Sequence, residues 1–201
     1  MGPPADVGAL TGEVKDDVQG WFMALVSRQW TQPAETLAHE ELEAVKGIAA
    51  TLESELSSPE VQRRIAAANQ PGVSSARVQN AILESVSKLG FASERSGLFK
   101  GYRTPGLRPD YYCHLPKYDS GILLEVERGK TTINNMDLLD FWKCHIAEEA
   151  HHLFLLVPRV LQQNSKSPRV TRPFDYVEKR LASFFVPGNL TNVRSCWLFG
   201  Y

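Results

Sequence analysis

The sequence has few cysteines and no long run of apolar residues. Three of its 201 residues are cysteine, an odd count that excludes a disulfide-rich scaffold and favours a reducing compartment. No stretch approaches the roughly 18 apolar residues that a membrane span needs. The first residues also lack the basic-then-apolar pattern of a secretory signal. We therefore expect a cytoplasmic protein without a membrane segment.

The common motifs for nucleotides and zinc are missing as well. Neither GxxxxGK[ST] nor GxGxxG occurs, so we expect no nucleotide cofactor. Cysteine and histidine stand side by side at Cys113-His114 and Cys144-His145, whereas zinc sites space their ligands by two to five residues. A Cys–His nucleophile pair stays open as an alternative, because its members would meet only in the folded chain.

The net charge of −1 is an average over two unlike parts of the chain. Residues 1–75 carry 11 acidic and 5 basic residues, a net charge of −6, whereas residues 76–201 carry 12 acidic and 17 basic residues, a net charge of +5. A basic second part keeps nucleic acid among the candidate partners. The hydrophobic share of 43% is typical of a globular protein with a sizeable core.

Helical spacing of apolar residues dominates the acidic first part. The segments with this spacing are 13–30, 34–55 and a third that Ser58 can cap and that begins at Pro59. The run Asn69-Gln70-Pro71-Gly72 then breaks the pattern. We interpret residues 1–72 as an N-terminal helical appendage that serves packing or dimerisation, and residues 73–201 as the main domain.

Helices and strands alternate in the second part. The predicted elements are a helix over 75–88, short strands near 97–103 and 110–115, a strand over 122–127, a helix over 131–149, a strand over 153–157, a helix over 174–185 and a strand over 193–199. The all-apolar run Leu153–Val157 is typical of a strand buried on both faces. On the helix over 131–149 we expect Met136, Leu139, Trp142 and Ile146 to face the core. This order predicts a mixed α/β sheet flanked by helices.

Three acidic residues occur on predicted strands, where buried charges are unusual. Asp110 opens one predicted strand, and Glu125 and Glu127 lie two apart on the strand over 122–127, so their side chains leave the same face. Paired carboxylates on a central strand repel each other and lose hydration. A divalent cation such as Mg²⁺ offsets both effects, because it prefers carboxylate oxygens and often shares them with a substrate phosphate.

The pattern Pro109-Asp110, 14 residues, Glu125-Val126-Glu127 resembles the PD-(D/E)XK nuclease superfamily. The resemblance covers about residues 75–158 and includes the order helix, three strands, helix, strand. It implies a restriction-endonuclease-like core, and it leaves the first 72 residues and about the last 40 unexplained.

The resemblance also implies roles for individual residues. Asp110 and Glu125 would bind Mg²⁺, for which Mn²⁺ can substitute. The family's motif lysine is replaced here by Glu127, as in some active restriction enzymes, so we expect Glu127 to orient the attacking water. Lys130 would supply the missing positive charge at the phosphate. Glu84, the acid on the preceding predicted helix, is the expected further metal ligand.

We expect two groups of residues to contact nucleic acid. The first follows the strand over 122–127 and consists of Arg128, Lys130 and Asn134. The second belongs to a basic loop and its continuation and consists of Lys166, Arg169 and Arg172.

These inferences together predict a Mg²⁺-dependent endonuclease that hydrolyses DNA phosphodiester bonds, similar to restriction or defence nucleases, and acts as a homodimer. The main alternative is a non-catalytic nuclease-fold module that binds nucleic acid or a protein. A further alternative is a structural or assembly protein in which the acidic helices make the functional contacts.

Overall fold

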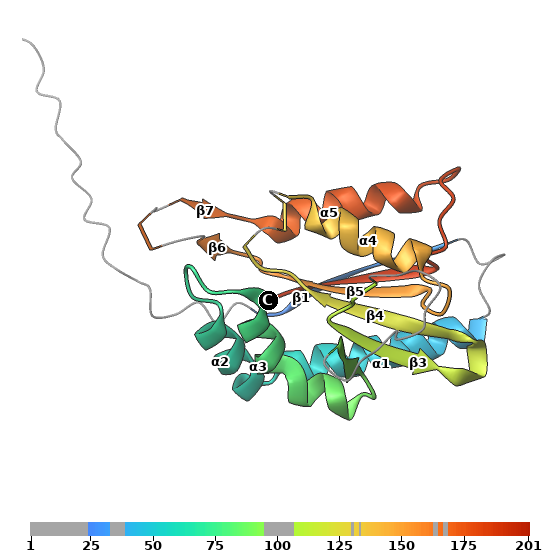
Figure 1. Cartoon of the computed structure of the whole chain (residues 1–201), viewed down its shortest axis with the longest axis horizontal. Coiled ribbons are helices and arrows are strands. Elements are labelled where there is room, and N and C mark those ends of the chain that lie inside the picture. The colour runs from blue at the N-terminus through green and yellow to red at the C-terminus, as the bar shows by residue number, and fades with distance from the viewer. Residues whose placement is uncertain are drawn as a thin grey trace, which may run out of the picture.

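The fold is a mixed α/β sheet with helices on both faces (Figure 1). The computed structural model describes residues 24–32, 39–94, 107–129, 131–132, 134–162, 165–166 and 169–201. The described α-helices are α1 (His39–Ser57), α2 (Pro59–Ala68), α3 (Ser75–Lys88), α4 (Met136–Ile146) and α5 (Pro173–Ala182). None of the helices in these ranges is both long and apolar enough to cross a bilayer.

Six strands form the main sheet in the order β1-β8-β5-β4-β3-β2. Their bounds are β1 (Val26–Thr31), β2 (Ala92–Ser93), β3 (Tyr111–Leu115), β4 (Ser120–Val126), β5 (His152–Val157) and β8 (Ser195–Gly200). The central strands β4, β5 and β8 run parallel, and the outer pairs are antiparallel. The helices α4 and α5 make the two crossovers between the parallel strands.

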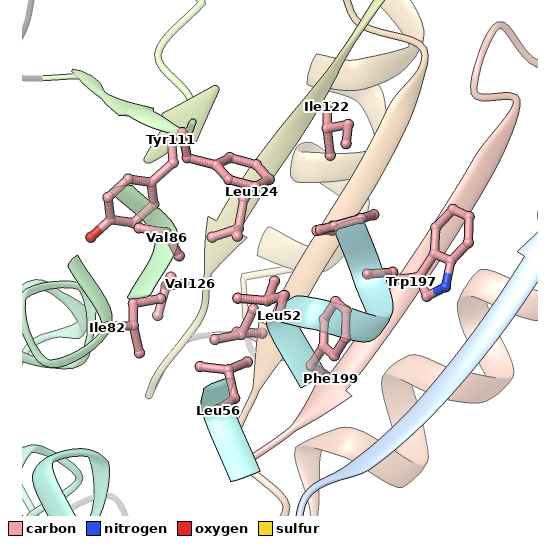
Figure 2. Packing of buried hydrophobic residues seen from close by; sticks show 14 of the residues in the cluster. Leu52, Leu56, Ile82, Val86, Tyr111, Ile122, Leu124, Val126, Trp197 and Phe199 are labelled. Carbon is pink, nitrogen blue, oxygen red and sulfur yellow. The ribbon is translucent and has the colours of Figure 1, made fainter. Parts of the chain in front are cut away.

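Each face of the sheet has its own hydrophobic core. The helices α1, α2 and α3 cover one face, where Leu52 and Leu56 of α1 meet Leu124 of β4 and Phe199 of β8 (Figure 2). The helices α4 and α5 cover the opposite face (Figure 1). Alternate residues of β4 therefore point to different layers, with Leu123 and Glu125 beneath α4.

The structure confirms the elements predicted over residues 75–88 and 110–158, where α3, β3, β4, α4 and β5 follow one another, and it adds the short strand β2, which the sequence did not predict. Every side chain of β5 is buried, as expected for an all-apolar central strand. The predicted cap of α2 is present, with Ser58 Oγ accepting a hydrogen bond from the Val61 N–H at 3.4 Å. The strand predicted near 97–103 lies outside the described residues.

The predicted helix over 13–30 is wrong for its last residues. Residues Val26–Thr31 form the edge strand β1, which pairs antiparallel with β8, while residues 13–23 lie outside the described part of the chain. The β-branched and aromatic residues Val26, Trp30 and Thr31 suit a strand. Residues 26–31 therefore form a strand because they pair with the edge of β8, although their apolar spacing also suits a helix.

The predicted inner face of the helix over 131–149 is also wrong. Leu139, Trp142 and Ile146 of α4 are each about half exposed. The buried residues of α4 are instead Asp137, Asp140, Phe141 and Cys144. The helix α4 therefore packs its two aspartates, Asp137 and Asp140, against the sheet. The spacing of apolar residues cannot predict this orientation, because two of the buried positions are acidic.

The segment that precedes the proposed boundary at 69–72 shares a core with the segment that follows it. Val45, Leu52 and Leu56 of α1 belong to the same buried cluster as Ile122 and Phe154 of the sheet. The apolar stripe of α1 is therefore covered by the sheet of its own chain. The division of the chain into residues 1–72 and 73–201 stays a prediction.

We predict that Leu52→Ala destabilises the whole fold. Leu52 is fully buried between α1 and the sheet, so its truncation should lower the free energy of unfolding by about 2–5 kcal/mol. Urea denaturation measures the change. Ser54→Ala on the exposed side of the same helix is the control, with an expected change below about 0.5 kcal/mol. Equal stabilities of the two variants would contradict the packing of α1 on the sheet.

Candidate active site

Asp110 and Glu125 meet where β4 ends and β3 begins. The backbone N–H of Asp110 donates to Glu125 Oε2 at 3.2 Å, and Asp110 Oδ2 accepts from the Val126 N–H at 2.8 Å. Antiparallel pairing of β3 with β4 creates this proximity, because Tyr111 lies opposite Leu124. The predicted approach of Asp110 to Glu125 is therefore confirmed.

Two further carboxyl groups adjoin this pair beneath α4. Glu127 follows the last residue of β4, and its N–H is fixed by Leu156 O of β5 at 2.8 Å. Its side chain interacts with Asp140 of α4, as does the side chain of Glu125. Glu125 and Glu127 thus lie on the same side of the sheet, as predicted. Sequence reasoning missed Asp140, because a helix acid is normally expected to face water.

One ammonium group lies among these carboxyls. Lys143 Nζ is 2.8 Å from Asp140 Oδ1 and 3.1 Å from Glu125 Oε1. The side chain of Lys143 is 28% exposed, whereas those of Glu125 and Asp140 are 3% and 1% exposed. The i, i+3 spacing of Asp140 and Lys143 is the sequence signal that could have indicated a shared helix face.

Burial dominates the electrostatics of the cluster. Loss of hydration raises the pKa of Asp110 to about 6, and burial together with the nearby Asp140 carboxyl raises the pKa of Glu127 to about 9. Burial and the same neighbour raise the pKa of Glu125 well above its ordinary value. Burial alone would lower the pKa of Lys143, but the Glu125 and Asp140 carboxylates raise it above its usual value.

Glu84, the expected further metal ligand, is not brought to this cluster. Its exposed carboxylate forms ion pairs with Arg64 and Lys88, each at 3.1 Å. The α3 residue that reaches the cluster is Gln79, whose side chain is hydrogen-bonded to Asp110. Glu84 and Gln79 are five residues apart and therefore leave α3 in different directions.

Arg128, predicted to contact nucleic acid, is instead used inside the protein. Its buried guanidinium donates to Asn69 Oδ1 at 2.9 Å and to the backbone carbonyls of Gln70 and Val73. Arg128 therefore holds the turn between α2 and α3 against the end of β4. Asn134 is exposed in the turn before α4, and Lys130 lies outside the described residues.

The second predicted group of cations lies at the same end of the sheet as the carboxyls. A small hairpin, β6 (Leu161–Gln162) paired with β7 (Val170–Thr171), follows β5 after three residues and projects beyond the sheet (Figure 1). Lys166, Arg169 and Arg172 on or next to this hairpin are exposed. Leu156, near the end of β5, accepts a hydrogen bond from the Glu127 N–H. The hairpin begins shortly after β5, so its first residues lie close to Glu127.

Asp110 and Glu125 suit a hard divalent cation, because both offer carboxylate oxygens from neighbouring strands. Within the described residues, no three His, Cys, Asp or Glu side chains are arranged to hold a metal ion by themselves. A Mg²⁺ site needs fewer protein ligands, since this ion commonly uses one or two carboxylates and completes its shell with water and substrate phosphate. Asp140 is buried beside this pair, where its carboxyl is hydrogen-bonded to Lys143 and Glu127 and adds further negative charge.

A second buried polar cluster lies at the opposite end of the parallel strands. His152 Nε2 is 3.0 Å from Glu41 Oε1, and the other ring nitrogen is hydrogen-bonded to Ser195 Oγ. Arg194 binds both Glu41 oxygens, at 2.7 and 2.8 Å. This Ser–His–Glu arrangement resembles a nucleophile triad, but Ser195 and His152 are fully buried, so no substrate reaches them. We interpret it as a structural network.

Comparisons with known proteins give no relative for this chain. A scan against protein-family models matches none of them, and a search of curated proteins finds no significant match. The site is therefore interpreted from its own geometry.

We predict that Glu127 makes the metal-free protein less stable as the pH rises. Its pKa is about 9 in the folded chain and about 4.5 in the unfolded chain, so the folded state holds the extra proton between these values. The free energy of unfolding should fall with pH over this range. The fall should be about 1 kcal/mol per pH unit steeper in the wild type than in Glu127→Gln, which has no proton to lose.

Urea denaturation in EDTA at pH 6, 7, 8 and 9 measures these slopes. Glu43→Gln is the matched control, because Glu43 is an exposed carboxylate whose pKa is lowered by its hydrogen bond to Lys46. Its slope above pH 6 should equal that of the wild type. Parallel slopes for the wild type and Glu127→Gln would show that Glu127 already ionises below pH 6.

Proposed function

We propose that this protein is a divalent-metal-dependent endonuclease that hydrolyses DNA phosphodiester bonds. The observation that carries the proposal is the close approach of Asp110 and Glu125 from two adjacent strands, with raised pKa values caused by burial. Carboxyl groups with such pKa values are costly for stability, and they cluster at functional sites. The site also lies at the carboxyl ends of parallel strands, where α/β sheets usually bind ligands.

The order of the elements supports the resemblance to PD-(D/E)XK nucleases. The helix α3, the antiparallel strands β2, β3 and β4, the helix α4 and the parallel strand β5 follow the order that the resemblance implies. Asp110 and Glu125 then occupy the positions of the motif acids. We therefore propose a restriction-endonuclease-like core for this part of the sheet.

The chemistry proposed for the site is hydrolysis by an activated water. Asp110 and Glu125 would hold Mg²⁺, or Mn²⁺ in its place. The bound ion polarises the phosphodiester and lowers the pKa of a coordinated water. Glu127 lies beyond the end of β4 and would orient the attacking water. The roles of Lys130 and Asn134 at the phosphate stay predictions.

Exposed cations next to the site support a nucleic-acid substrate. Lys166, Arg169 and Arg172 lie on or beside the hairpin that leaves the same end of the sheet as Glu127. Flexible exposed cations of this kind bind the phosphate backbone without reading the base sequence. We propose that the hairpin contacts the strand on one side of the scissile phosphate.

One observation favours a second candidate function, a non-catalytic module with a nuclease-like fold. Both oxygens of Glu125 already accept hydrogen bonds, one from Lys143 and one from the Asp110 N–H. A carboxylate whose two oxygens already accept hydrogen bonds from the protein does not require a metal ion. Under this alternative the chain would bind nucleic acid or a protein without cleaving anything.

The proposed homodimer needs a surface other than the one expected. The apolar stripe of α1 is covered by the sheet, so it does not require a second copy of the chain. Exposed apolar side chains occur instead on α4, at Leu139, Trp142 and Ile146. A dimer that brings two sites to the two strands of a duplex stays a proposal.

We predict that the wild-type protein cleaves DNA in Mg²⁺ or Mn²⁺ and not in EDTA. Asp110→Asn and Glu125→Gln should each abolish cleavage, because each removes a negatively charged metal ligand and keeps the side-chain size. The loss should exceed the roughly 10- to 100-fold effect that is typical of removing an outer partner of a metal ligand. Gel assays on supercoiled plasmid and on genomic DNA measure the rates.

The control for this assay is Glu43→Gln, which removes an exposed carboxylate on α1 and should cleave at the wild-type rate. DNA binding without cleavage, with either metal and either DNA, would favour the non-catalytic module. Cleavage that survives both site substitutions would exclude Asp110 and Glu125 as the metal ligands.

We predict that the hairpin cations supply much of the salt-dependent affinity for DNA. A triple glutamine variant of Lys166, Arg169 and Arg172 should lower the slope of log K against log salt by about 2–3, because each phosphate contact contributes about 0.9. Fluorescence anisotropy with a labelled duplex in EDTA measures the slope.

The control is a variant with the same loss of charge elsewhere on the surface. It carries glutamine at Arg63 and Lys88, which are exposed on α2 and α3, and at Lys46, whose side chain is 41% exposed on α1. If both triple variants change the slope equally, the hairpin is not a specific contact surface and only the total charge matters.

A further inference from the structure

We propose that Lys143 is a positively charged group of the catalytic site and that its ammonium lies at the scissile phosphate when DNA is bound. The proposal rests on the proposed function, and it assigns to α4 a role that no motif in the sequence indicates. The observation behind it is that Lys143 Nζ lies between Glu125 and Asp140 at 3.1 and 2.8 Å.

The first argument is the charge of the cluster. Asp110, Glu125, Glu127 and Asp140 interact with one another in a largely buried region. Within the described residues, Lys143 is the basic residue that forms ion pairs with them. A divalent cation on Asp110 and Glu125 would still leave the buried Asp140 carboxylate next to an anionic phosphodiester. A fixed positive charge is therefore needed for the substrate to approach and for the charge that develops in the transition state.

The second argument is position. The side chain of Lys143 is 28% exposed, whereas its two partners are almost completely buried. The ammonium therefore lies between the carboxyls and the solvent, on the side from which DNA arrives. Lysine carries its three donors on a flexible stem, so it can keep one carboxylate and also turn a donor to a phosphate oxygen.

The third argument excludes the neighbouring cations. Arg128 is buried and donates to Asn69 and to the chain at Gln70 and Val73, away from the acids. Arg180 approaches α4 from α5, but its guanidinium is 3.3 Å from Asp137 and 3.0 Å from Asn135. Both arginines therefore serve the packing of loops and helices around the site.

The test compares Lys143→Gln and Lys143→Arg with the wild type in the plasmid assay under steady-state conditions. Lys143→Gln should lower kcat by about 100-fold or more and change KM for DNA less than about threefold, because a charge that acts in the transition state affects kcat. Lys143→Arg keeps the charge and should recover at least a tenth of the wild-type kcat. The control Lys46→Gln, an exposed lysine on α1, should leave kcat unchanged.

A folding check separates this role from a structural one. Circular dichroism and urea denaturation of each variant show whether it is folded under assay conditions. If Lys143→Gln is unfolded, the double variant Lys143→Gln/Asp140→Asn removes the ion pair as a unit and leaves no unpaired charge on α4. It should fold and be as inactive as expected for Lys143→Gln.

Two results would overturn the inference. One is a folded Lys143→Gln protein, or a folded double variant, with kcat within threefold of the wild type. The other is an equal loss of kcat in Lys143→Gln and Lys143→Arg, which would mean that the shape of the lysine matters and its charge does not. A wild-type protein that cleaves no DNA would instead refute the proposed function itself.

Discussion

The structure depends on one electrostatic constraint, the burial of several carboxyl groups around a single ammonium. Glu125 and Asp140 are almost completely buried, and Lys143 Nζ lies within 3.1 Å of both. An isolated carboxylate in an apolar layer costs several kcal/mol, so it needs a partner charge or a proton. Lys143 supplies the charge for two of the acids, and the raised pKa of Glu127 shows that this acid keeps its proton instead. The end of β4 and the buried face of α4 therefore accommodate these acids by ion pairing with Lys143 and by protonation of Glu127.

The same constraint sets the orientation of α4. Asp137 and Asp140 lie on its buried side, so Leu139, Trp142 and Ile146 are turned toward solvent. A helix selected only for stability would place its apolar residues inside and its acids outside. The reversed arrangement is therefore costly for the free energy of folding, and the proposed site for a cation and a phosphate would give it a physical reason. The crossover from β4 to β5 is also what brings a residue far along the chain, Lys143, next to the end of β4.

The sequence predicted much of the sheet and part of the site. The apolar runs of β4 and β5 and the cap of α2 carry strong local signals, and the pairing of β3 with β4 placed Asp110 beside Glu125 as expected. The strand β1 was missed because its conformation depends on the distant edge of β8. Asp140 and Lys143 were missed for a similar reason. Asp140 is buried against the sheet and Lys143 forms its ion pairs there, whereas the helical pattern alone predicts that both residues face the solvent.

The two ends of the parallel strands explain why we propose a site at one acidic cluster and not at the other. At the amino ends, burial would raise the pKa of Glu41, but hydrogen bonds from His152 and Ser120 and the charge of Arg194 lower it to about 2. That carboxylate has every partner it needs within the protein. At the carboxyl ends, burial and the neighbouring carboxyl of Asp140 raise the pKa of Glu125. Both clusters are buried, so burial alone does not distinguish them. The difference is that partners within the protein lower the pKa of Glu41, whereas the pKa of Glu125 is raised, and this is the reason for proposing a cation site at the second cluster.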